Sequence, residues 1–363
     1  MANLLQDRNW VAIALVFVLV IRVSAPLAQA RNDGVCDKNC HYKVLHGFEG
    51  PPNDGTYPHA GVVLDAFDDV YGTTTAGGSG TCKGGCGTIF EISNSGVETV
   101  LYSFAGGTDG SGQIGELIAD SSGNLFGTTS GGGAHGYGTV FKLDTSGIET
   151  MLYSFVGSPD GASPIAGLIF DAAGDLFGTT SGGGTHNNGT VFKLDTSGVE
   201  TVPHSFAGSP DGADPYASLI FDAKGNLYST TVGGGKGGYG TVFKLATTGK
   251  ETVLHDFPQS GKGDGENPYA PLVLDRAGSL YGTASAGGGW SGGVIFKIDT
   301  AGKETVLYHF YEAHGTGLFG AKPVAGLTWD AKGDLYGSTL WGEHNPCGGR
   351  QTVGCGVVFK FTP

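Results

Sequence analysis

The 363-residue sequence contains few charged residues, and basic residues are the scarcest of them. Charged residues make up 15% of the chain, and 20 Lys and Arg stand against 34 Asp and Glu, which gives a net charge of −14 at pH 7. The Lys and Arg residues are scattered singly along the chain. Nucleic acids and anionic membrane surfaces are bound by clustered positive charge. We therefore expect no nucleic acid and no membrane as a partner, whereas a cationic ligand or a divalent metal is compatible with the charge.

Long hydrophobic runs are also nearly absent. The exception, residues 10–21, is shorter than the roughly 20 residues that a membrane-spanning helix needs. The small residues Ala28-Gln29-Ala30 follow it and match a signal-peptidase cleavage pattern. We predict a signal peptide over 1–30 and a secreted protein, extracellular or periplasmic, with an uncleaved anchor as the alternative.

Cysteines are few, and all six fall in close pairs. The pairs are Cys36/Cys40, Cys82/Cys86 and Cys347/Cys355. In an exported chain such pairs predict local disulfides, although six cysteines allow 15 connectivities. Zinc is the alternative, but structural zinc sites favour tighter cysteine spacing and reduced thiols.

Glycine, in contrast, is abundant, with 68 residues against 2 Met. Gly weakens a helix interior by about 1 kcal/mol relative to Ala, so this composition predicts short strands and tight turns. Gly131, Gly133 and Gly136 do match the G-x-G-x-x-G pattern of dinucleotide-binding loops. That motif requires a helix after its glycines, and here a strand pattern follows. We therefore assign these glycines to a hairpin turn.

An internal repeat organises the chain. The hexapeptide GTVFKL begins at Gly138, Gly189 and Gly240, and diverged copies begin at Gly87, Gly293 and Gly356. Each copy lies within a series of four short apolar runs, which in the third unit cover 167–172, 175–184, 189–195 and 200–206. Runs of this length, rich in Val, Ile, Thr and aromatics and bounded by Gly, Asp and Ser, are typical of strands. Four such strands in about 50 residues make one propeller blade.

The sequences at the two ends of the chain distinguish a closed ring of blades from an open array of hairpins. The last unit stops after its third strand, and the missing fourth strand is matched by HYKVLHGF, residues 41–48. Splitting one unit between the two ends closes a ring and removes exposed strand edges, whereas an open stack would carry capping repeats. We predict an all-β fold, a six-bladed β-propeller of four-stranded blades closed by the strand 41–48, with a single domain over 31–363.

The unit sequence resembles a known family. The segments DAAGDLFGTTSGGG (171–184) and GTVFKLDTSGVETV (189–202) are similar to the GloVer tandem repeat of secreted bacterial proteins, over about 41–363. The resemblance implies an exported β-propeller repeat protein and no established activity, so it supplies no catalytic residues. Family members often end in a cell-surface sorting segment. Here the chain ends on its last predicted strand, so free secretion is expected.

The loops between blades contain a repeated Asp-Gly pair. Turn chemistry explains such a pair, since Asp caps its own turn and Gly adopts a positive φ. A ring of carboxylates holding Ca²⁺ is the functional alternative; otherwise we expect no cofactor. The sixth loop has His314-Gly315 instead of Asp-Gly. The five aspartates are Asp54, Asp109, Asp160, Asp211 and Asp264.

The loops between the second and third strands differ from blade to blade. We expect them on the same face as the loops between blades, where variable tips on a constant scaffold build a binding surface. Trp290 is suited to stacking on sugar rings, as are the nearby Trp341 and Tyr137. The alternatives are that the exposed tips vary in sequence without a function and, for the histidines, that they bind a metal. The residues at the tips are Lys83, His135, His186, Lys236, Trp290 and His344.

Three functions follow from these patterns, one of them a purely structural component of the cell envelope. The first is a non-catalytic, monomeric binding protein that holds a carbohydrate or an extracellular protein on this loop face. The alternative is an extracellular polysaccharide hydrolase or lyase with its site at the mouth of the central channel, using the asymmetry of His314, Trp341 and His344. Gly289–Gly293 matches the G-x-S-x-G elbow, but it lacks the strand–elbow–helix context of that motif.

Overall fold

The computed structural model describes residues 45–258, 263–311, 320–346 and 354–363, all within one compact unit, Val44–Pro363. The predicted signal peptide, 1–30, lies outside the described residues. No helix occurs in the described ranges, and therefore none is long and apolar enough to cross a membrane.

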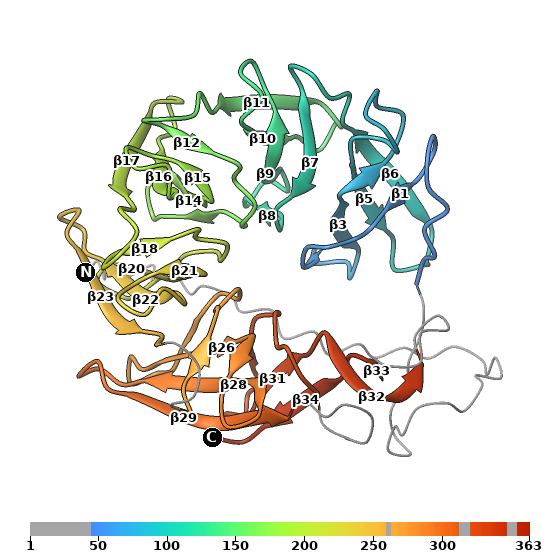
Figure 1. Ribbon diagram of the computed structural model, residues 1–363. Helices are drawn as coiled ribbons and strands as arrows, with labels where there is room; N and C mark the ends of the chain where they lie inside the picture. Colours follow the sequence, from blue (N-terminus) through green and yellow to red (C-terminus); the bar gives the residue numbers. More distant parts are fainter. Residues whose placement is uncertain (1–44, 259–262, 312–319, 347–353) are drawn as a thin grey trace, which may run out of the picture. The chain divides into compact units, whose positions relative to one another are not determined.

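The strands form six antiparallel sheets that follow one another around a ring in chain order, which confirms the six-bladed propeller (Figure 1). Fourth strands such as β11 and β29 lie at the outside of the ring, and first strands such as β8 lie at the inside (Figure 1). Blades 1 to 3 contain β2 (Val63–Leu64), β3 (Val70–Thr74), β5 (Thr88–Ile92) and β6 (Glu98–Ser103); β8 (Ile118–Ala119), β9 (Leu125–Gly132), β10 (Thr139–Leu143) and β11 (Glu149–Ser154); and β13 (Ile169–Phe170), β14 (Leu176–Thr180), β16 (Thr190–Leu194) and β17 (Glu200–Ser205).

The second half of the ring repeats this order. Blades 4 to 6 contain β19 (Ile220–Phe221), β20 (Leu227–Thr231), β22 (Thr241–Leu245) and β23 (Glu251–Asp256); β25 (Val273–Leu274), β26 (Leu280–Ala284), β28 (Ser291–Ile298) and β29 (Glu304–Tyr311); and β30 (Thr328–Trp329), β31 (Leu335–Ser338) and β34 (Val358–Phe361).

Short two-stranded ladders connect the start of each unit to the end of its second strand. In blade 2 this ladder is part of the main sheet, through β7 (Gly110–Ile114) and the end of β9. The separate ladders are β1 (Gly55–Thr56) with β4 (Ala76–Gly77), β12 (Gly161–Ala162) with β15 (Gly182–Gly183), β18 (Gly212–Ala213) with β21 (Gly233–Gly234), and β24 (Gly265–Glu266) with β27 (Ala286–Gly287). In blade 6 the equivalent contact is the single bridge between Ala321 and Trp341, and the pair β32 (Trp341–Pro346) with β33 (Gly354–Cys355) lies between the second strand and the third.

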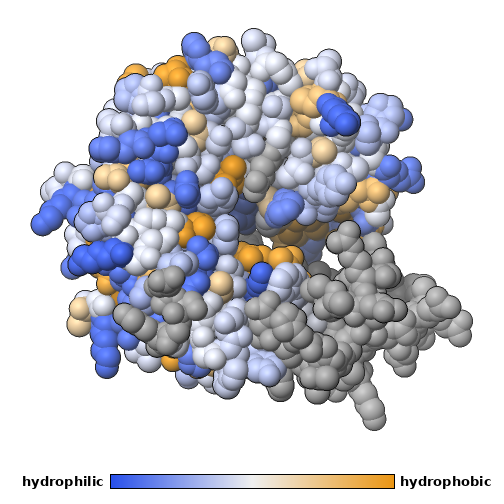
Figure 2. Space-filling model, viewed as in Figure 1, coloured by the Kyte–Doolittle hydropathy of each residue, from blue (hydrophilic) through white to orange (hydrophobic). Residues whose placement is uncertain are grey.

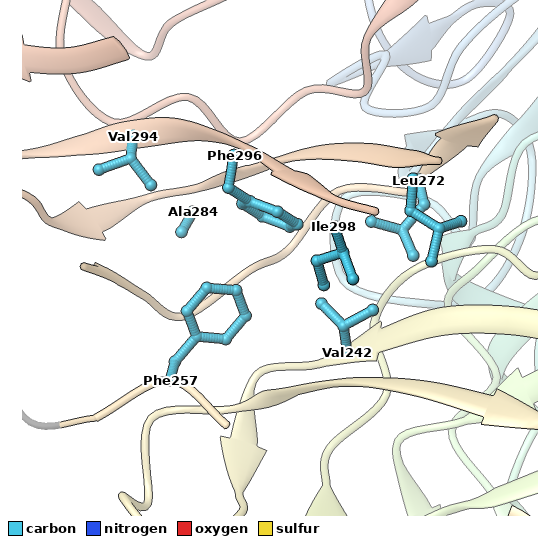
Figure 3. Close-up of a cluster of buried hydrophobic side chains, with 8 residues drawn as sticks. Val242, Phe257, Leu272, Ala284, Val294, Phe296 and Ile298 are labelled. Carbon is cyan, nitrogen blue, oxygen red and sulfur yellow. The ribbon is translucent and has the colours of Figure 1, made fainter. Parts of the chain in front are cut away.

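Phenylalanine rings hold neighbouring blades together. A Phe within or just beyond each fourth-strand segment meets the Phe of the GTVFKL strand in the next blade; Phe257 and Phe296, for example, have ring centroids 5.2 Å apart at an interplanar angle of 65° (Figure 3). Edge-to-face pairs are favourable beyond the apolar area that they bury. The same contact recurs as Phe48–Phe90, Phe104–Phe141, Phe155–Phe192, Phe206–Phe243 and Phe310–Phe359.

The repeated glycine of the second strand makes room for these rings. A Cβ on Gly178 would lie 2.6 Å from the ring of Phe192 and 2.9 Å from Leu168, closer than packed atoms allow. Gly133 and Gly136 adopt φ values of 80° and 79°, and the strand β10 follows them. This confirms that the G-x-G-x-x-G pattern forms a turn and not a phosphate loop.

The predicted closing strand is described only in part. Residues 41–44 lie outside the described residues, residues 45–48 carry no strand, and blade 6 has three strands in the part that is described. Even so, His46 and Phe48 make the contacts to blade 1 that fourth-strand residues make elsewhere: Phe48 packs on Phe90, and His46 bonds Asp54. The contacts of this segment therefore correspond to those of a fourth strand preceding blade 1.

One predicted disulfide is confirmed. Cys82 and Cys86 are joined with an S–S distance of 2.07 Å, in the loop between the second and third strands of blade 1. Cys36, Cys40 and Cys347 lie outside the described residues, so the pairs Cys36/Cys40 and Cys347/Cys355 stay predictions.

Candidate functional site

Two sets of loops meet on one face of the ring, called here the loop face. In blade 5 the carbonyl of Gly292, at the start of the third strand β28, accepts a hydrogen bond of 2.8 Å from the Lys322 amide at the start of blade 6. Equivalent bonds run from Ser163 to Tyr137, from Asp214 to Asn188 and from Asn267 to Tyr239. Side chains from both kinds of loop can therefore contact one ligand.

The Asp-Gly aspartates occupy the joints between blades. In the joint before blade 4, the Asp211 carboxylate is bonded to His204 Nε2 at 3.1 Å and accepts the amides of Ala207 and Gly212. Asp54, Asp109, Asp160 and Asp264 lie in the same kind of joint, each bonded to a His or Tyr of the preceding unit. Each carboxylate is thus held within its own turn and joint.

Each of these joints also contains a glutamate, which begins the fourth strand of the blade that follows the joint. Burial, and after it the charge of Asp160, raises the pKa of Glu200 from 4.5 to about 7. The pKa values of Glu149, Glu251 and Glu304 are raised to about 7, chiefly by burial. These carboxyls hold their protons close to neutral pH because the joint removes water and places an aspartate charge nearby, which His204 and His255 only partly offset at Glu251 and Glu304.

Two joints contain a set of groups that could hold a metal. The ligand atoms of His46, Asp54 and Glu98 lie within 4.8 Å of one another, as do those of His255, Asp264 and Glu304. Among the described residues, no two of the five aspartates fall in one such set. A cation at these positions would sit between two blades, apart from the other joints.

The described residues at the variable tips lie on the surface. Lys83, His135, His186 and Lys236 are exposed, and His186 Nδ1 lies 3.0 Å from the neighbouring Thr185 hydroxyl. His314 lies outside the described residues, and only the backbone of His344, in β32, is described. No tip histidine belongs to a potential metal set within the described part of the chain.

Blades 5 and 6 carry an aromatic cluster on the loop face, called here the aromatic platform: Trp290, His309, Tyr311, Lys322 and Trp341. The Trp290 side chain is 55% exposed, and its ring meets those of Tyr311 and His309 edge-on, at centroid distances of 5.7 and 6.0 Å. The amide of Gly289 is bonded to His309 Nδ1 at 3.2 Å, which fixes the Trp290 loop.

The blade 6 part of the platform lies against that loop. The Lys322 amide is bonded to Gly292, and its ammonium lies 3.8 Å from the centroid of the Trp341 ring, a cation–π contact. The two tryptophans that the sequence suggests as sugar contacts are therefore connected through one lysine. On the face that Figure 2 shows, hydrophobic residues form small separate patches among hydrophilic ones.

Comparison with known families decides the family of the chain. The Gloeobacter/Verrucomicrobia repeat matches residues 35–171 and 149–350, most of the sequence. The protein belongs to the Gloeobacter/Verrucomicrobia repeat family. A comparison with curated proteins finds no significant match.

Solved structures similar to this repeat-family member include the following three. The extracellular domain of a proposed one-component system from B. thetaiotaomicron aligns with 82% of the chain and 35% of its own, at 14% identity and a TM-score of 0.51. A Xanthomonas campestris gluconolactonase aligns with 80% and 84% of the two chains, at 14% identity and a TM-score of 0.45. A streptogramin B lyase aligns with 85% and 95%, at 15% identity and a TM-score of 0.39. At 14% identity, the similarity to the B. thetaiotaomicron domain indicates a shared fold and not a shared activity.

Sequence reasoning missed one residue of this repeat protein. Glu116 lies just before β8, at a position where the other units have Gly61, Gly167, Ser218, Pro271 and Gly326. Aligning the six units on their inner loops would have singled it out as the one charged residue at that position.

Proposed function

We propose that the protein is a secreted, non-catalytic binding protein that holds a carbohydrate on the loop face, with the aromatic platform as the contact. The single observation that carries the proposal is Trp290, a large apolar side chain more than half exposed on a loop that hydrogen bonds hold in place. Large apolar surface is usually buried or used in binding.

The chemistry of the platform suits a sugar ring. The faces of aromatic rings are electron-rich and attract the C–H groups of a pyranose, while the polar edges of Trp and Tyr donate hydrogen bonds to hydroxyl groups. Trp290 offers such a ring, and Tyr311, 42% exposed, adds a hydroxyl group beside it. Binding sites of this kind combine apolar contacts with a few placed polar groups.

The described residues form no complete nucleophilic triad. They contain three His–Asp pairs, His46–Asp54, His204–Asp211 and His255–Asp264. No serine, threonine or cysteine is bonded to a histidine of these pairs in the described part of the chain, and all three pairs lie in joints between blades. A nucleophilic triad needs a hydroxyl or thiol on the same histidine.

Replacing the platform tryptophan tests the proposal. We expect Trp290→Ala to weaken binding of the best glycan found on an array at least tenfold, about 1.4 kcal/mol, because stacking area is lost while the loop backbone keeps its bonds. The measurement is a calorimetric titration of the secreted full chain.

The matched control is Phe67→Ala. Phe67 is 73% exposed in the turn between the first and second strands of blade 1, so its loss tests whether any exposed aromatic contributes. Unchanged glycan binding by Trp290→Ala, or an array on which the wild-type protein binds no glycan, would contradict the proposal.

A further inference from the structure

The innermost loops of the six blades form a ring of residues around the axis, called here the inner ring: Gly61, Glu116, Gly167, Ser218, Pro271 and Gly326. Contacts connect its members: the Gly167 amide donates to the Ser218 hydroxyl at 3.0 Å. Thr128 and Thr179 donate their hydroxyls to the next blade's Ala166 and Ala217, one residue before the ring positions. The ring is thus built by neighbouring blades in turn.

Glu116 places a carboxylate in this otherwise neutral ring. A Cβ on Gly61 of blade 1 would lie 2.5 Å from Glu116 Oε1, and one on Gly167 of blade 3 would lie 3.2 Å from Glu116 Cβ. The side chain therefore lies against a glycine of each neighbouring blade, where an added Cβ would force it to shift. It is directed across the boundary toward blade 1.

Solvent can reach the Glu116 carboxylate, although the surrounding protein removes part of its hydration. Glu116 is exposed to solvent, yet burial raises the pKa of its carboxyl, and no nearby positive charge lowers that pKa. Such a combination is expected for a group inside an opening, where protein surrounds it but small molecules can reach it. A partly dehydrated carboxylate without a cation is costly, and this cost is relieved when a cation binds.

We propose that Glu116 and the inner ring form a binding site for an organic cation, the ammonium group of an amine or of an amino sugar. A divalent metal fits less well because Ca²⁺ requires six to eight oxygen ligands and the inner ring offers one carboxylate. Ser218 adds a hydroxyl to the same ring. The site is separate from the aromatic platform and goes beyond the proposed function.

Paired ligands that differ in charge test this site. Ligand-observed NMR titrations of the full chain compare n-butylammonium with n-butanol, and glucosamine with glucose. We expect the cationic member of a pair to bind at least tenfold more tightly than its neutral match. Binding of n-butylammonium alone identifies a free amine as the ligand class, and binding of glucosamine alone identifies an amino sugar.

Variants assign the site to Glu116. We expect Glu116→Gln, which keeps the shape and removes the charge, to weaken ammonium binding at least tenfold. Gly61→Ala, which displaces the carboxylate while keeping it, should weaken binding several-fold, and Glu49→Gln, at an exposed glutamate elsewhere, should leave it unchanged. The proposal is overturned if Glu116→Gln binds like the wild type, if the neutral ligands bind equally well, or if only Ca²⁺ binds in a Glu116-dependent way.

Discussion

Phe192→Ala should lower the free energy of unfolding by about 3 to 5 kcal/mol, the usual cost of removing a buried Phe side chain. Phe192 is fully buried, packs on Phe155 of the preceding blade at 5.0 Å between centroids, and fills the space that Gly178 leaves. The change removes the central ring of a joint and leaves a cavity between two blades. Denaturant unfolding followed by fluorescence measures the loss.

The repeat supplies internal controls for this prediction. Phe141 and Phe243 are equally buried and make the same contact in other joints, so their Ala variants should lose similar stability. Phe67→Ala, at an exposed ring, should cost under about 0.5 kcal/mol. A Phe192→Ala variant as stable as Phe67→Ala would show that the phenylalanine pairs do not hold the blades together.

Stability should fall as the pH rises from about 4.5 to about 7. The pKa values of Glu149, Glu200, Glu251 and Glu304 are raised to about 7 in the fold, so the folded state binds more protons than the unfolded state in this window. The stabilisation is complete below pH 4.5 and is lost as the pH passes 7. Allowing for solvent screening, each glutamate contributes about 1 to 2 kcal/mol. A Tm lower by roughly 5 to 10 °C at pH 8 than at pH 5 follows.

Glutamine variants isolate the four carboxyls from other titrating groups. Replacing all four with Gln mimics the protonated form at every pH, so the decline of Tm between pH 5 and pH 8 should nearly disappear. Glu49→Gln, at an exposed glutamate, should leave the decline as it is. If the fourfold variant kept the full pH dependence, the joints would not be its source.

The repeat made the architecture predictable, and local chemistry made part of the site predictable. Six copies of one strand sequence fixed the number of blades, and the contacts of His46 and Phe48 agree with the assignment of 41–48. Trp290 and Trp341 could be selected as large residues on glycine loops. Their connection through Lys322 could not, because it depends on where blade 6 packs.

The pKa shifts and the partners of charged residues were the features of the site least predictable from the sequence. The raised pKa of Glu200 depends on packing between two blades, which a sequence does not display. The aspartates of the Asp-Gly pairs sit in turns, as turn chemistry predicts, but their His and Tyr partners come from the preceding unit. Glu116 stands out only when its position is compared with the same position in the other five units.

Closure of the ring by residues 41–48 is the claim on which this account depends, and a cross-link tests it directly. In the complete blades the Lys or Glu of the third strand pairs with a fourth-strand Thr, as Lys244 does with Thr252. Aligning HYKVLHGF with the other fourth strands predicts that Lys43 takes this place opposite Lys360 in blade 6. Directly opposed residues lie close enough for a disulfide.

Mass spectrometry of oxidised Lys43→Cys/Lys360→Cys protein should find the two positions joined within one chain, and Lys43→Cys/Lys193→Cys should remain unlinked. Free thiols in the first variant, or linkage between separate chains, would contradict a ring closed by its own N-terminal strand.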